Sequence, residues 1–260
     1  MPVSADPAAI AQPTVPRLPA LSWARVVIRL SAMVGWLLMC VPTYYAARLL
    51  RLPIHVPRMF LAGIGRIAGA RIATKGSPAP APVALIANHV SWLDIPALAR
   101  ARGAAFIAHD GLSAHPVLRW LCEMNGTTFI ARHDRAGVAG QVDQMRAALA
   151  THPVVTLFPE GTTSDGRGLL PFKSSLLSAL DPAPAGTTIQ PVLLNYGPGS
   201  AEVAWVGTEH GVHNFLKILG RAGRLPIVVH YLPPLEGSSL ASRKAMTAAA
   251  QAALGAALAR

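Results

Sequence analysis

Residues 82–94 read PVALIANHVSWLD. The first half of this stretch is a short apolar run, which is typical of a buried strand. Four polar residues that can carry chemistry follow at once, where the strand ends: Asn88, His89, Ser91 and Asp94. Because α/β proteins hold their ligands at the carboxyl ends of strands, this stretch predicts both a strand and a site at its carboxyl end.

Similar runs recur along the chain and predict the rest of the sheet. They lie at 104–109, 127–132, 153–161, 189–197, 203–207 and 226–234. Helix-like stretches separate them, notably 135–150, 174–180 and 239–259. Strands that alternate with helices predict an α/β fold, with a largely buried sheet flanked by helices.

The chain divides into four expected parts. Residues 1–20 are rich in proline and form a disordered tail. Residues 21–75 form a basic, apolar and helical membrane-anchoring segment, which ends before the Gly/Pro-rich boundary at 76–80. The α/β domain covers 76–235, and a C-terminal helix lies within 236–260.

The composition is apolar and basic together. The 260 residues have a net charge of +11, yet only 13% are charged and 52% are hydrophobic. This excludes a mainly disordered chain, and two cysteines exclude a disulfide scaffold. Nine basic side chains and one acidic side chain fall within residues 1–80. The combination favours an anionic membrane surface as a partner and not nucleic acid.

An uncharged stretch of 18 residues, Leu30–Ala47, lies between arginines. Its length is at the lower limit for a bilayer span, and Pro42 weakens it further. We expect an embedded helical hairpin whose arginines meet lipid headgroups; a true span and a buried core helix remain open. The glycine-rich segment 63–69 is interpreted as helix packing, because its spacing does not fit a dinucleotide-binding fingerprint.

The pair His89 and Asp94 allows two interpretations. If a turn separates them, Asp94 can fix the tautomer of the imidazole and leave its other nitrogen to act as a base. Alternatively, Asp94 caps the next helix and His89 is an ordinary loop residue. Taken alone, the residues favour neither interpretation.

Two further motifs also end apolar runs. In 126-GTTFIAR-132, Arg132 could bind a phosphate or carboxylate with its planar guanidinium, although a solvated surface arginine is the plainer interpretation. The loop 157-LFPEGTTSDG-166 offers free backbone N–H groups to an anion. Glu160 would repel a phosphate, so it is expected to hold backbone donors or an arginine, or to receive a substrate hydroxyl.

In this order and spacing, the motifs resemble the phospholipid/glycerol acyltransferase family, of the lysophosphatidic acid acyltransferase type. The hallmark N-H-x-x-x-x-D is matched by Asn88, His89 and Asp94. The pattern G-x-x-F-I-x-R is matched at 126–132, F-P-E-G-T at 158–162, and a late P-V pair at 191–192. The resemblance covers roughly residues 75–235.

The resemblance implies a glycerol-3-phosphate acyltransferase-like fold and a mechanism. His89 removes a proton from an acceptor hydroxyl, which attacks the thioester of acyl-CoA or acyl carrier protein, while Asp94 orients His89. Backbone N–H groups near the His89 loop would bind the oxyanion. No acyl-enzyme, metal or cofactor is implied. Substrate binding is assigned to Asn88, Ser91, Gly126, Phe129, Arg132, Glu160, Gly161, Thr162 and Lys173.

The acceptor implied first is 1-acyl-glycerol-3-phosphate, a lyso-lipid that would yield phosphatidic acid. The segment 162–177 is also similar to the lyso-ornithine lipid acyltransferase branch, and Ser175 stands where many family members carry glycine. Lyso-ornithine lipid is therefore the alternative acceptor. An inactive membrane scaffold is the alternative of another class. The expected location is the membrane, at the cytoplasmic face of the inner membrane.

Overall fold

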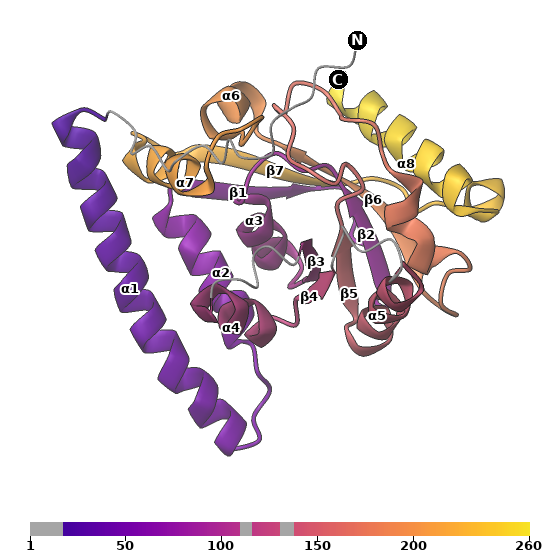
Figure 1. The fold of residues 1–260 in the computed structure, drawn as a ribbon, viewed down its shortest axis with the longest axis horizontal. Helices are drawn as coiled ribbons and strands as arrows, with labels where there is room; N and C mark the ends of the chain where they lie inside the picture. Colours follow the sequence, from indigo (N-terminus) through magenta and orange to yellow (C-terminus); the bar gives the residue numbers. More distant parts are fainter. Residues whose placement is uncertain (1–17, 110–115, 131–137) are drawn as a thin grey trace, which may run out of the picture.

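The computed structural model describes residues 18–109, 116–130 and 138–260, which form one mixed sheet with helices on both faces (Figure 1). Its order is β1-β7-β6-β2-β5-β3-β4. The strands are β1 (Ala70–Lys75), β2 (Val83–Ala87), β3 (Ala105–His109), β4 (Thr128–Ile130), β5 (Val154–Leu157), β6 (Thr188–Asn195) and β7 (Leu225–Tyr231). The helices are α1 (Ala20–Leu49), α2 (Val56–Ile67), α3 (Asp94–Ala101), α4 (Pro116–Met124), α5 (Val138–Thr151), α6 (Ser200–Val203), α7 (Gly211–Gly220), α8 (Arg243–Leu258) and the 3₁₀ segments η2 (Ser174–Leu180), η3 (Gly197–Gly199) and η4 (Gly237–Leu240).

Three neighbouring strands in the middle of the sheet run in one direction. β2 pairs in parallel with β6 on one side and with β5 on the other. β7 is antiparallel to β6. The carboxyl ends of β6, β2 and β5 therefore meet at one edge of the sheet, and the loops that follow these strands lie side by side.

The central strand β2 shows why both faces of the sheet are covered. All five of its residues are buried, as the apolar run predicts. Val83, Leu85 and Ala87 belong to one core cluster, and Ala84 and Ile86 belong to the other. This alternation is the period of a strand, so each face packs on its own layer of helices. The prediction of a sheet flanked by helices is confirmed.

Two predictions of secondary structure are wrong. Residues 203–207 were expected to form a strand, but Val203 ends α6 and the chain beyond it is irregular. Only Val203 and Ala204 are buried, and Val206 is 43% exposed. The segment packs beside the His89 loop, where the backbone N–H of Trp205 donates to the Val90 carbonyl at 3.1 Å. Residues 70–75, expected to be helical, form the edge strand β1.

The helices α1 and α2 pack against each other as a hairpin. The indole N–H of Trp36 in α1 donates to the Phe60 carbonyl in α2 at 3.1 Å. A Cβ atom at Gly63 would lie 2.2 Å from that indole nitrogen, so only glycine allows this approach. A Cβ atom at Gly65 would likewise lie 2.8 Å from the Cβ of Pro96 in α3. The interpretation of this glycine-rich segment as helix packing is confirmed.

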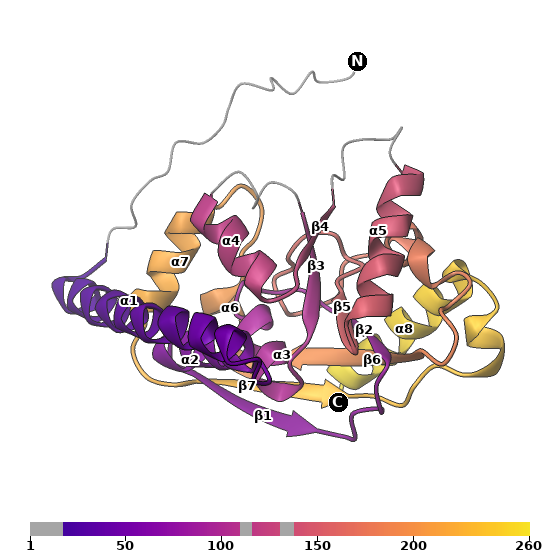
Figure 2. The ribbon, with the colours of Figure 1, turned by 90° about the horizontal axis from the view of Figure 1, so that it is seen from below.

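Helix α1 is the one helix in the described ranges that is long and apolar enough to cross a membrane. Its buried residues recur every seven positions, at Val26, Met33 and Cys40. Most of its other large apolar side chains are exposed. In Figure 1 the C-terminal end of α1 extends beyond the sheet, and Figures 1 and 2 both place α1 and α8 on opposite sides of the molecule.

The N-terminal half of α1 is fixed to the α/β body by arginine. The Arg29 guanidinium donates to the carbonyls of Leu219 and Arg221 at 2.9 Å and of Ile218 at 3.3 Å, at the C-terminal end of α7. A cation at a helix C-terminus meets unpaired carbonyls and the negative end of the helix dipole. The expectation that the arginines beside the apolar stretch meet lipid headgroups is therefore wrong for Arg29.

Candidate active site

The three central parallel strands each deliver part of the site. His89 follows β2, Phe158 and Glu160 follow β5, and Tyr196 follows β6. Asn88 ties two of these strand ends together: its side-chain amide donates to the Leu194 carbonyl at 3.1 Å, and its oxygen accepts the Leu194 N–H at 2.7 Å. Asn88 thereby continues the pairing of β2 with β6 and fixes the start of the His89 loop.

Asp94 holds the imidazole of His89. Nδ1 of His89 lies 2.7 Å from Oδ2 of Asp94, which is 0% exposed. Because a carboxylate accepts, Nδ1 carries the proton and Nε2 is left as the basic nitrogen. The imidazole is 23% exposed, so it can be reached from outside. The turn that this geometry requires is present, and Asp94 is the first residue of α3.

The backbone of the same loop wraps around the Asp94 carboxylate. Oδ2 also accepts the N–H groups of Val90 at 2.7 Å and Ser91 at 3.0 Å. Oδ1 accepts the hydroxyl of Tyr196, a fully buried side chain that sequence reasoning missed. Burial, reinforced by the neighbouring Asp94 charge, raises the pKa of Tyr196 well above its usual value, so its hydroxyl keeps its proton. The only sequence signal for Tyr196 is its place directly after β6.

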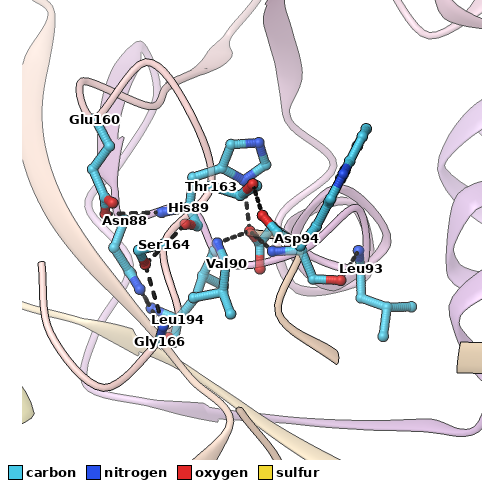
Figure 3. Close-up of polar contacts among 12 residues, drawn as sticks. Asn88, His89, Val90, Leu93, Asp94, Glu160, Thr163, Ser164, Gly166 and Leu194 are labelled. Atoms are coloured by element: carbon cyan, nitrogen blue, oxygen red, sulfur yellow. Dashed lines mark hydrogen bonds and ion pairs between the residues drawn. The ribbon is translucent and has the colours of Figure 1, made fainter. Parts of the chain in front are cut away.

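Glu160 approaches the His89 loop from the side opposite Asp94 (Figure 3). Its Oε1 accepts the His89 backbone N–H at 3.1 Å, and its Oε2 accepts the Leu170 N–H at 3.4 Å. Burial raises the pKa of Glu160 to about 7; the Asp94 charge adds to this effect, and the two N–H donors oppose it. Of the roles expected for Glu160, the structure shows the holding of backbone donors.

The backbone donors of the His89 loop are thus already in use. The N–H groups of His89, Val90 and Ser91 all point to the carboxylates of Glu160 or Asp94. The expectation that N–H groups near this loop are available to an oxyanion is wrong for these three.

The 158–164 loop also contacts the imidazole and the backbone of His89. The Phe158 ring stacks on the imidazole with 4.3 Å between centroids and 21° between planes. Ser164 donates its N–H to the His89 carbonyl at 2.7 Å. The Thr163 hydroxyl donates to the Trp205 carbonyl, which links this loop to residues 203–207.

The other predicted site residues lie in different surroundings. Ser91 is fully buried in the loop. Thr162 and Lys173 are exposed, and a Cβ atom at Gly161 would lie 3.0 Å from the Lys173 Nζ. Gly126 and Phe129 belong to the turn before β4 and to β4, at the far edge of the sheet, about 14 Å from β2 at the usual spacing of strands. Arg132 lies outside the described residues.

The site therefore combines a basic imidazole nitrogen, an accessible ring and a rigid support. This arrangement suits the removal of a proton from a hydroxyl group. Within the described ranges, no group of three His, Cys, Asp or Glu side chains is placed to hold a metal ion.

Comparisons with known proteins agree on one family. The family model described as Acyltransferase matches residues 71–195. The chain is 32% identical to the lyso-ornithine lipid O-acyltransferase of Rhodobacter capsulatus over 88% of each chain. It is 40% identical to the 1-acyl-sn-glycerol-3-phosphate acyltransferase of Neisseria gonorrhoeae over 46% of this chain and 48% of that one.

A solved structure shares the fold. The crystal structure of PlsC, the 1-acyl-sn-glycerophosphate (LPA) acyltransferase of Thermotoga maritima, superposes with a TM-score of 0.60 at 17% identity. The match covers 90% of this chain and 96% of that chain.

Proposed function

The chain belongs to the acyltransferase family, and we propose that it moves a fatty acyl group from a thioester donor to the free hydroxyl of a lyso-lipid. The observation that carries this proposal is the buried Asp94 carboxylate at 2.7 Å from Nδ1 of an accessible His89. An imidazole held in this tautomer can take a proton at Nε2. The donor is acyl-CoA or acyl carrier protein, and no cofactor or metal takes part.

In the proposed reaction His89 acts first as a base and then as an acid. Nε2 takes the proton of the acceptor hydroxyl while its oxygen attacks the thioester carbonyl. The tetrahedral intermediate collapses, the ester forms, and the C–S bond breaks. The departing thiolate takes the proton back from the imidazolium, so the enzyme returns to its starting state. Asp94 supports the transient imidazolium charge.

For the acceptor, we propose a lyso-ornithine lipid. The Rhodobacter capsulatus relative with this named activity matches 88% of the chain, whereas the Neisseria gonorrhoeae relative named for 1-acyl-sn-glycerol-3-phosphate matches 46% of it. The segment 162–177, which resembles this branch, contains the exposed residues Thr162 and Lys173, and the Lys173 ammonium lies beside Gly161. A cationic side chain there suits a carboxylate in the ornithine head as well as a phosphate. Lysophosphatidic acid is the second candidate.

A substrate panel tests this function. Purified protein receives acyl-CoA alone, with lyso-ornithine lipid, or with lysophosphatidic acid, and thiol release and lipid product are measured. We expect thiol release only with an acceptor, and faster with lyso-ornithine lipid. Release without acceptor would identify a hydrolase, and no release would favour an inactive scaffold. His89→Ala should abolish transfer; more than a tenth of the wild-type rate would contradict the mechanism.

Arg132 sharpens the choice of acceptor, and its role rests on the motif match. If a dianionic phosphate binds Arg132, Arg132→Ala should raise the acceptor KM by about ten- to a hundredfold, as expected for the loss of a charged hydrogen bond. With a zwitterionic ornithine head as the acceptor, Arg132→Ala should raise the acceptor KM by a smaller factor. The donor KM should stay nearly constant in both cases, because the thioester lies at His89.

We also propose that α1 and α2 hold the enzyme at the cytoplasmic face of the inner membrane. Leu38 is 68% exposed on the apolar helix α1, where an aspartate would be costly in lipid. Leu38→Asp should therefore reduce flotation with anionic vesicles. Leu240→Asp is the control, since Leu240 is 40% exposed and lies in η4. Equal flotation of both variants would contradict the anchor.

A further inference from the structure

Tyr196 reaches the His89 loop from a neighbouring strand. It follows β6, which pairs in parallel with β2 up to the partners Ala87 and Val192. The Asn88 side chain then bonds both backbone groups of Leu194, so the two strand ends cannot slide past each other. This connection places the Tyr196 side chain beneath the loop, 1% exposed and within reach of Asp94.

The two oxygens of the Asp94 carboxylate have different partners. Oδ2 accepts from His89 Nδ1 and from the N–H groups of Val90 and Ser91. Oδ1 accepts from the Tyr196 hydroxyl. The three donors on Oδ2 all come from the loop that must be oriented, whereas Tyr196 directly follows strand β6 of the central sheet. Rotation of the carboxylate would break the contact with Tyr196 and with Nδ1 together.

We propose that Tyr196 is a positioning residue for acyl transfer: its hydroxyl fixes Oδ1 of Asp94 and thereby keeps Oδ2 on Nδ1 of His89. The proposal rests on the proposed role of His89 as the base. Tyr196 touches no reacting atom, and its effect passes through Asp94 alone. The raised pKa of Tyr196 agrees with a hydroxyl that acts only as a donor to this carboxylate.

Tyr196→Phe tests this role, because phenylalanine keeps the buried ring and removes the hydroxyl. We expect kcat to fall by about ten- to a hundredfold, the factor for one hydrogen bond to a charged group, with both KM values unchanged. The carboxylate left without this donor should stabilise the protonated imidazole more strongly. The acid limb of the kcat profile should therefore move to higher pH, which a mere loosening of the core would not cause.

Tyr231→Phe is the matched control. Tyr231 is also buried, in the adjacent strand β7, and its hydroxyl has no hydrogen-bond partner among the described residues. Its loss should change kcat by less than twofold and leave the pH profile in place. Comparison of Tyr196→Phe with Tyr231→Phe therefore separates the effect of removing any buried hydroxyl from the effect of removing the hydroxyl that donates to Asp94.

The Asp94→Asn background shows whether Tyr196 acts through Asp94. In that background Tyr196→Phe should cause no further loss of kcat, because coupled residues are not additive. If Tyr196→Phe alone does not fold, the double variant Tyr196→Phe/Asp94→Asn should fold, because residue 94 then carries no buried charge that needs the Tyr196 hydroxyl as a donor. The proposal is overturned if kcat of Tyr196→Phe stays within twofold of wild type, or if Tyr196→Phe lowers kcat equally in the Asp94→Asn background. It is also overturned if neither Tyr196→Phe nor the double variant folds. Activity in His89→Ala would instead reject the proposed function.

Discussion

Two loops with buried carboxylates meet at His89, residues 88–94 and residues 158–164, and they hold different parts of it. Asp94 in the first loop accepts from the imidazole, from two backbone N–H groups and from Tyr196. Glu160 in the second loop accepts backbone N–H groups of His89 and Leu170 over longer distances. The first loop sets the direction of the ring, and the second sets the position of the backbone that carries it. Their environments, not their chemistry, separate their roles.

The largest expected effect comes from the first loop. Asp94→Asn keeps the shape of the side chain but lets an amide face Nδ1, which favours the wrong tautomer of His89. We expect kcat to fall on the order of 10⁴-fold, by analogy with the same exchange in a catalytic triad. Steady-state kinetics measures the loss. Asp165→Asn, at an exposed position, is the control, and a loss below tenfold in Asp94→Asn would remove the distinction between the two loops.

The second loop should reveal itself in stability as pH changes. The pKa of Glu160 is raised from 4.5 to about 7, so the folded state holds this proton more tightly than the unfolded state. The resulting stabilisation is complete below pH 4.5 and is lost as pH rises through about 7. Relative to Glu160→Gln, which does not titrate, the wild type should lose about 3 kcal/mol across this range.

Urea unfolding of both proteins in detergent at pH values from 4.5 to 8 measures this difference. Groups other than Glu160 contribute equally to both proteins and cancel in the comparison. Parallel curves would mean that Glu160 does not change its proton affinity on folding, and the two carboxylates would then differ less than the structure implies.

A smaller effect should follow from the ring that the second loop lays on the imidazole. Phe158→Leu keeps an apolar side chain but removes the stack on His89. An aromatic pair contributes about 0.5–1.5 kcal/mol, so kcat/KM should fall by about two- to tenfold. Phe172→Leu is the control, because both phenylalanines are 8% exposed and Phe172 packs in the opposite core cluster. Equal losses would assign the effect to general packing.

The smallest effect concerns residues 203–207, which bond to both loops through the backbone of Trp205. Thr163→Val removes the hydroxyl that donates to the Trp205 carbonyl and keeps the side-chain volume. We expect a loss of about 1 kcal/mol in stability, which is about 2–4 °C in Tm, and less than threefold in kcat. Thr151→Val removes a hydroxyl that donates to the Ala147 carbonyl within the same helix, and it should lower the stability less. A large loss of kcat in Thr163→Val would indicate that residues 203–207 take part in the reaction site.

The sequence predicts the parts of this site that come from single strands. The apolar runs identify β2, β5 and β6, and the residues after β2 and β5 include His89, Asp94 and Glu160. The sequence does not predict Tyr196, since its role depends on β6 lying beside β2. Local patterns carry no information about strand order.

The wrong predictions have the same physical origin. The residues 203-VAWVG-207 were predicted to form a strand because they are apolar, but only Val203 and Ala204 are buried, and the backbone of Trp205 bonds Val90 in the His89 loop and not a strand. β1 was missed because it is an edge strand with mostly half-buried or exposed residues, so its sequence ARIATK lacks the apolar run that marks the central strands. The docking of Arg29 on α7 joins residues about 190 positions apart, which no periodicity can reveal.

That docking has a thermodynamic consequence for the whole enzyme. Arg29 joins the apolar helix to the end of α7, and α7 belongs to the layer that covers the sheet. Helix and sheet therefore unfold as coupled parts, and any medium that binds the folded helix shifts the equilibrium of the sheet by mass action. If α1 is embedded as proposed, a bilayer around it acts as a ligand of the α/β body, and the site gains stability from lipid bound at a distant helix.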